Sequence, residues 1–131
     1  MIDRVQQELE LLRSRYPDLE YRREGQWIRI PAYDLPAGWS PQSMNVAFQI
    51  PVGFPGTPPY GIYVPAGLRF AGQVPGNYAE PAPTQPPFDG TWGCFSWAPA
   101  DGEWRVATEP GKGSNLLNWA LGFAVRFREG Q

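Results

Sequence analysis

The chain has 131 residues, 42% of them hydrophobic and 15% aromatic, which is the length of one domain with enough apolar surface for a core, so global disorder is excluded. Eleven basic against thirteen acidic residues give a net charge of −2, and no basic stripe indicates nucleic-acid binding. One cysteine and no histidine exclude an internal disulfide, the usual zinc sites and histidine-dependent triads. We expect a single domain over residues 1–131 without a metal or cofactor.

The start of the chain lacks the apolar core of a signal peptide. No run approaches the ~20 consecutive apolar residues that a membrane-spanning helix needs. We therefore expect a cytoplasmic protein that does not act on a membrane.

Residues 2–15 have the pattern of an amphipathic helix. Apolar side chains recur at spacings of three and four residues, at Ile2, Val5, Leu9 and Leu12. Arg13 and Arg15 in the last turn complement the negative end of the helix dipole, and Pro17 ends the helix. Because acidic and basic residues are mixed on the polar face, we expect that face to be solvated.

The next three segments predict a four-stranded antiparallel β-meander. Residues 19–30 form a hairpin around a turn at Glu24-Gly25, which separates two apolar runs. Residues 43–50 alternate apolar and polar side chains with the period of two that marks a strand with one buried face. Residues 60–64 supply the fourth strand.

Residues 65–92 are rich in Gly, Pro, Ala and Asn and show no sustained periodicity. A loop of this length is uncommon in a compact domain and is usually functional or disordered. Four side chains give the segment aromatic and aliphatic anchors: Leu68, Phe70, Tyr78 and Phe88. We predict a long irregular segment that forms an ordered active-site flap.

The C-terminal segment predicts a second helix with a broad apolar face. Ser114 is a favourable N-cap residue for it. Its apolar positions are Leu117, Trp119, Ala120, Leu121, Phe123, Ala124 and Phe127. An N-terminal helix, a meander, an irregular segment and a C-terminal helix together indicate the α+β class.

A proline-rich segment, GFPGTPP at residues 53–59, joins the third and fourth predicted strands. Its prolines fix φ and donate no hydrogen bond to a ladder, so they end the third strand in a rigid turn. Farther along, Gly90 lies four residues before Cys94, and Trp104 lies ten residues after it. This order resembles the ubiquitin-conjugating-enzyme (UBC-like) fold, in which a Tyr/Phe-Pro stretch followed by Pro-Pro joins strands three and four, and Gly-x-x-Cys and a later Trp follow.

Over residues 1–128 the chain is more similar still to a bacterial branch of that superfamily, prokaryotic family E. This branch accompanies activating-enzyme-like and ubiquitin-like proteins in conjugation operons, and it shares the proline segment and the run YVPAGLRF that follows. Two features depart from the pattern. The His-Pro-Asn motif of conjugating enzymes is missing, and Ser96-Trp97-Ala98 stands where the branch commonly has Ser-Arg-His. A histidine-dependent step is therefore not carried over.

The resemblance implies that Cys94 accepts the C-terminus of a ubiquitin-like protein from an activating enzyme as a thioester and passes it to an acceptor. Thiolate chemistry suits this step, because the thiolate is a strong nucleophile and its acyl derivative reacts with amines. Gln85, nine residues before the cysteine, is a candidate oxyanion donor. Asp101 and Asp89 bracket the cysteine and are candidates for orienting or deprotonating an attacking amine. Ser96 is a candidate oxyester acceptor, although it has no base.

Structural roles are the competing interpretation of each of these residues. Cys94 would then be an ordinary buried thiol between Trp92 and Phe95, and the aspartates would be turn residues. The matching alternative function is a UBC-like binding module that holds a ubiquitin-like protein or an activating enzyme without transfer. A third class, an aromatic-rich β-sandwich that binds glycans, is suggested by six Trp and six Tyr but does not fit a helix at each end.

Overall fold

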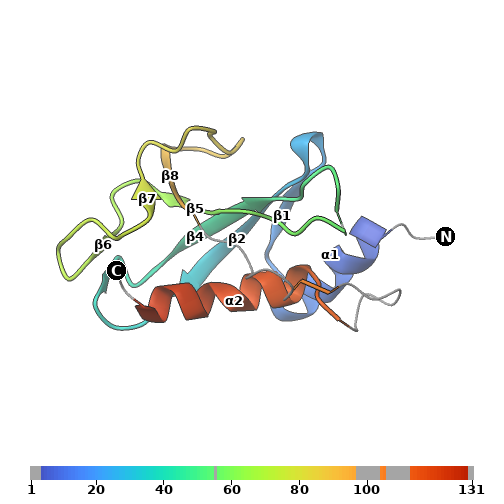
Figure 1. The fold of residues 1–131 in the computed structure, drawn as a ribbon, viewed down its shortest axis with the longest axis horizontal. Coiled ribbons are helices and arrows are strands. Elements are labelled where there is room, and N and C mark those ends of the chain that lie inside the picture. The colour runs from blue at the N-terminus through green and yellow to red at the C-terminus, as the bar shows by residue number, and fades with distance from the viewer. Residues whose placement is uncertain (1–3, 55, 97–103, 106–112, 130–131) are drawn as a thin grey trace.

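The computed structural model describes residues 4–54, 56–96, 104–105 and 113–129, and Figure 1 shows its strands above a long C-terminal helix. The helices are α1 (Arg4–Arg15), the single-turn η1 (Glu24–Gln26) and α2 (Leu116–Glu129). The strands are β1 (Glu20–Arg22), β2 (Trp27–Asp34), β3 (Trp39–Ser40), β4 (Ser43–Gln49), β5 (Ile62–Pro65), β6 (Arg69–Phe70), β7 (Tyr78–Ala79) and β8 (Trp92–Phe95). The α+β class is confirmed, and no helix in these ranges is long and apolar enough to cross a membrane.

Six of the strands in the described ranges form one antiparallel sheet in the order β1-β2-β4-β5-β8-β7, while β3 and β6 pair separately. The first four strands of this order are the predicted meander. The prediction of only four strands was wrong, because β8 pairs along the full length of β5 and β7 adds to the far edge of β8. The segment predicted to be irregular therefore contains β6 and β7 and leads directly into β8.

The sheet face toward α1 and α2 carries the main hydrophobic core. Phe48 of the sheet packs edge-on against Trp119 and Phe123 of α2, with ring centroids 6.1 and 5.9 Å apart. The apolar face predicted for the C-terminal helix is confirmed at Trp119, Ala120, Phe123 and Phe127, which are buried. Leu121, which belongs to the predicted apolar face, is 42% exposed and so lies outside the fully buried stripe of the helix.

The start of α2 differs from the prediction by one residue. Asn115 is the N-cap: its side-chain oxygen accepts a hydrogen bond from the amide of Asn118 at 2.7 Å. The predicted N-cap, Ser114, instead accepts a hydrogen bond from the amide of Arg105 at 2.8 Å. The fully buried carboxylate of Glu8 accepts a hydrogen bond at 2.7 Å from the amide of Leu116, another N–H at the N-terminus of α2. This bond links α1 to α2.

The proline-rich connection between β4 and β5 folds into consecutive turns. The amide of Phe54 donates to the carbonyl of Pro51 at 3.1 Å, and the amide of Thr57 donates to the carbonyl of Gly53 at 3.0 Å. The Phe54 ring is anchored against Trp104, with centroids 6.4 Å apart. This stiff connection positions the start of β5, the strand that pairs with β8.

The opposite face of the sheet is covered in part by the segment between β7 and β8, coloured yellow to gold in Figure 1. Its Phe88 belongs to a second, smaller cluster of buried residues: Trp27, Ala47, Phe88 and Trp92. We call this helix-free side of the sheet the outer face. It carries the only cysteine of the chain.

Candidate functional site

A cross-strand row on the outer face contains Cys94. The pairings Ala79–Cys94, Cys94–Tyr63, Tyr63–Ala47, Ala47–Arg29 and Arg29–Glu20 run across the sheet from β7 to β1. Opposite residues in neighbouring strands point to the same side, whereas adjacent residues in one strand point to opposite sides. Because Phe95 is buried in the main core, Cys94 points away from the helices.

The Cys94 side chain is half-buried, and its environment disfavours the charged form. Its Sγ lies 3.5 Å from the carbonyl oxygen of Phe95, to which the thiol donates. Burial raises the pKa of the thiol, and a hydrogen bond with Tyr63 opposes that rise in part. At neutral pH the group is therefore mainly a thiol that remains within reach of solvent.

Gly61 packs closely against the sulfur. A Cβ at this position would lie 3.2 Å from Sγ of Cys94 and 3.7 Å from Cε1 of Tyr63. The φ of Gly61 is +89°, a conformation that L side chains rarely adopt. Glycine is thus required at residue 61 both for the backbone angle and for the close approach of the thiol.

Gln85 acts as a clamp on β8. Its side-chain oxygen accepts a hydrogen bond from the amide of Trp92 at 2.9 Å, and its Nε2 donates to the carbonyls of Trp92 and Ala82 at 3.0 and 3.1 Å. Both N–H groups of the amide therefore have backbone acceptors, one at Ala82 and one at Trp92, two residues before Cys94. To serve as the predicted oxyanion donor, Gln85 would have to release one of these bonds.

Asp89 and Ser96 are the other predicted site residues that the structure describes. Asp101 and Trp97 lie outside the described residues. The backbone carbonyl of Asp89 accepts a hydrogen bond from the indole of Trp92 at 3.2 Å, which holds that ring in the outer cluster. Ser96 is exposed, and its amide donates to the carbonyl of Asn77 at 2.9 Å. Of the described candidates, Gln85 is thus hydrogen-bonded to Trp92 of β8, the strand that carries Cys94.

Tyr63 is the neighbour of the thiol that the sequence analysis missed. Its ring packs edge-on against Trp27, with centroids 5.0 Å apart. Burial, followed by the influence of Cys94, raises the pKa of Tyr63 to about 12. The signal that would have revealed this residue is the pairing of β5 with β8, which requires the prediction of β8 as a strand.

The far edge of the sheet is held by a charged network on the core side. The Glu80 carboxylate accepts hydrogen bonds from Arg69 and from the amide of Gly67, both at 2.6 Å, and from the hydroxyl of Tyr78 at 2.8 Å. These bonds, led by the one from Arg69, lower the pKa of Glu80 to about 2. The buried Arg126 of α2 stacks on Phe95, with its guanidinium carbon 4.6 Å from the ring centroid. Strands β7 and β8 are therefore fixed to the helix layer.

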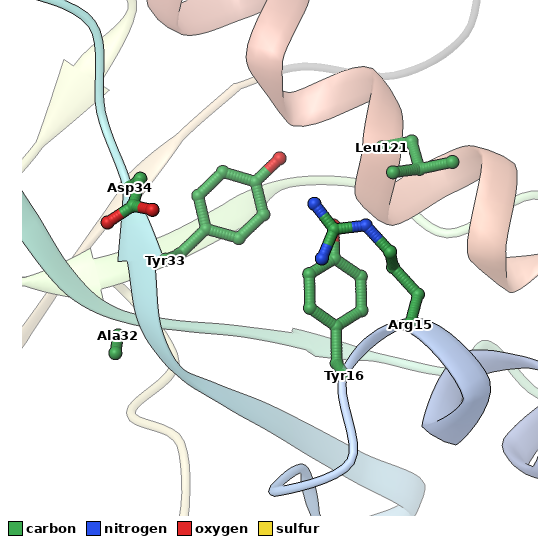
Figure 2. A pocket seen from close by; sticks show the side chains of 6 residues that line it. All are labelled: Arg15, Tyr16, Ala32, Tyr33, Asp34 and Leu121. Carbon is green, nitrogen blue, oxygen red and sulfur yellow. The ribbon is translucent and has the colours of Figure 1, made fainter.

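Among the hollows on the described surface, two are lined by both acidic and basic side chains. One, of about 310 Å³, opens on the outer face beside the row and is lined by Arg22, Glu24, Gly25, Trp27, Gln85 and Pro87. The other, of about 250 Å³, lies where the end of α1, strand β2 and helix α2 meet, and is lined by Arg15, Tyr16, Ala32, Tyr33, Asp34 and Leu121 (Figure 2). Figure 2 shows the Arg15 guanidinium in front of the Tyr16 ring, 5.0 Å from its centroid, with Leu121 on α2 above. The lining of this second hollow contains no cysteine or serine nucleophile.

Within the described ranges, no group of three or more Cys, Asp and Glu residues is placed to hold a metal ion. Comparisons of the chain with protein-family models, with curated proteins and with solved structures found no match. A function is therefore inferred from the residues around Cys94 and from the motifs of the sequence.

Proposed function

We propose that this protein is a UBC-like carrier that accepts the C-terminus of a ubiquitin-like protein from an activating enzyme as a thioester on Cys94 and transfers it to an acceptor. The observation that carries the proposal is the position of the thiol. It is the only sulfhydryl of the chain, half-exposed on the outer face and packed against Gly61. The proline-rich connection that precedes β5, of the kind that UBC-like proteins carry, supports the same assignment.

The chemistry is an exchange between two thioesters. The thiolate of Cys94 attacks the carbonyl carbon of the incoming thioester, a C–S bond forms, and the bond to the sulfur of the activating enzyme breaks. The proton lost by Cys94 is balanced by the proton that the leaving thiolate takes up, so no oxidant or reductant is needed. An acceptor amine or hydroxyl then repeats the attack on the new thioester.

The raised pKa of Cys94 has opposite effects on the rate and on the equilibrium of the first transfer, in which Cys94 takes up the acyl group. Less thiolate is present at neutral pH, so spontaneous attack is slow. A more basic thiolate is, however, a stronger nucleophile and a poorer leaving group, so the thioester on Cys94 forms favourably from a thiol of lower pKa. A carrier of this kind needs its thiol reduced, and we place it in the cytoplasm for that reason.

A binding module without transfer is the second candidate, and two observations favour it. The N–H groups of Gln85 already have backbone acceptors, and the hollow beside the row offers contact surface without a nucleophile in its lining. In this case the chain would hold a ubiquitin-like protein or an activating enzyme, while Cys94 packs against Tyr63.

Incubation with an activating enzyme, ATP and a ubiquitin-like protein separates the two candidates. A carrier gives an adduct that reductant releases and that Cys94→Ser loses or converts to a base-labile oxyester, whereas Ser96→Ala keeps the reductant-sensitive adduct. The carrier is ruled out if no adduct forms although the activating enzyme is charged and the protein binds it; that result leaves the module.

A further inference from the structure

Acyl transfer through Cys94 needs a hydrogen-bond donor for the negative oxygen of the tetrahedral intermediate. Removing one such donor from an enzyme typically slows the reaction by about 10²–10³-fold. Gln85, the donor predicted from the sequence, has both N–H groups committed to the carbonyls of Ala82 and Trp92. Another group near the thiol must therefore supply the donor.

Tyr63 lies directly opposite Cys94 in the β5–β8 pair, and both side chains point to the outer face. In an antiparallel pair such residues have Cβ atoms about 4.5–5.5 Å apart. Both side chains also lie close to Gly61: a Cβ at that residue would be 3.2 Å from Sγ and 3.7 Å from Cε1 of the Tyr63 ring. An acyl carbon bonded to Sγ would therefore stand next to the phenol.

From this arrangement we infer that the hydroxyl of Tyr63 donates the hydrogen bond that stabilises the oxyanion during acyl transfer to and from Cys94. The inference rests on the proposed function, because it assigns a role in the reaction proposed for the same thiol. It extends the site to Tyr63, the first residue of the run YVPAGLRF, to which the sequence analysis gave no role.

Packing holds the phenol ready for this role. The edge-on contact with Trp27 fixes the ring from the side of β2, and the outer cluster buries it in part. With a pKa of about 12, the hydroxyl stays protonated at neutral pH and so remains a donor. The Tyr63 proton stays on its oxygen throughout the step; only the C–S bonds form and break.

The test compares two reactions of the same thiol. Phenyl thioacetate acetylates Cys94 through a tetrahedral oxyanion, whereas iodoacetamide alkylates it without one. Both need the thiolate, so any change in the fraction of thiolate cancels in the ratio of the two rates. We expect Tyr63→Phe, which keeps the ring against Trp27, to lower the ratio of acetylation to alkylation by about 100-fold. Tyr60→Phe, a change at the exposed tyrosine three residues earlier, should leave it unchanged.

An unchanged ratio in Tyr63→Phe would overturn the inference, as would a thiol that reacts with neither reagent in the folded protein. If the ratio falls but no adduct forms with the activating enzyme and the ubiquitin-like protein, the role of Tyr63 stands and the proposed function fails. The two ideas are thus tested separately.

Discussion

Adding one methyl group at Gly93 should disturb β8 more than its small size suggests. The Tyr78 side chain crosses directly over this glycine: a Cβ at residue 93 would lie 2.6 Å from Cζ of Tyr78, and closer to its hydroxyl oxygen. The tyrosine has little freedom to move, because its hydroxyl donates to Glu80 at 2.8 Å and its ring packs on Phe95 with centroids 4.9 Å apart. Gly93→Ala must therefore displace β8 or break the bond to Glu80.

Both routes have a comparable cost. Forcing a methyl group into a packed site costs about 1–3 kcal/mol. Losing a hydrogen bond to a charged group costs about 1.5–3 kcal/mol, and the lower end applies because the Glu80 side chain is 25% exposed. We expect Gly93→Ala to lower the free energy of unfolding by about 2 kcal/mol, which for a domain of this size lowers Tm by roughly 8 °C.

A double-mutant cycle tests the reasoning. Unfolding by urea and by heat, followed by tryptophan fluorescence, gives the cost of Gly93→Ala in the native background and in the background of Tyr78→Ala. Removal of the tyrosine ring should reduce that cost to about 0.5 kcal/mol or less, since contacting residues couple while independent sites add. Equal costs in both backgrounds would show that Tyr78 does not lie over Gly93.

Three further predictions concern titratable groups. Glu8→Ala should cost about 2–3 kcal/mol in urea unfolding, because it leaves the amide of Leu116 without its carboxylate acceptor, while Glu8→Gln, which keeps an acceptor, should cost less. For Cys94, alkylation by iodoacetamide should rise with pH to a midpoint above the ~8.5 of an ordinary thiol, and the unfolded chain should return to that value. The pKa of Glu80 is lowered from 4.5 to about 2, so its contribution to stability is present above the unfolded value and is lost as pH falls toward 2. In Glu80→Gln the free energy of unfolding should fall less steeply between pH 4.5 and about pH 2. The same acid dependence in the variant and the native protein would contradict the network around Arg69.

Local patterns predicted most of the elements because those elements bury one face. The alternation Met44, Val46, Phe48 of β4 and the spacing of Leu9 and Leu12 in α1 are direct consequences of a core on one side. Strand β8 escaped prediction for the same physical reason. Its four residues, Trp-Gly-Cys-Phe, are buried or half-buried on both sides of the sheet, so the sequence has no polar position with which to mark a face.

The candidate site could be predicted only as far as its nucleophile. Cys94 stands out because it is the one thiol of the chain, but Tyr63 becomes visible as its partner only through long-range pairing between β5 and β8. The choice of Gln85 followed its distance along the chain from Cys94. In the structure its side-chain amide bonds the N–H and the carbonyl of Trp92, as a neighbouring strand would. Distance along the sequence alone does not distinguish this role from that of an oxyanion donor.

The division of the sheet into two faces decides which substitutions can test function cleanly. Phe95 and Gly93 point to the helix layer, where changes act through packing, whereas Cys94 and Tyr63 point to the outer face and are only half-buried. Cys94→Ser and Tyr63→Phe each alter one atom or one hydroxyl there, without touching the contacts among Phe48, Phe95 and Phe123. Loss of acyl transfer in these variants with an unchanged unfolding curve would therefore report chemistry, whereas a parallel loss of stability would mean that the thiol and the phenol serve the fold.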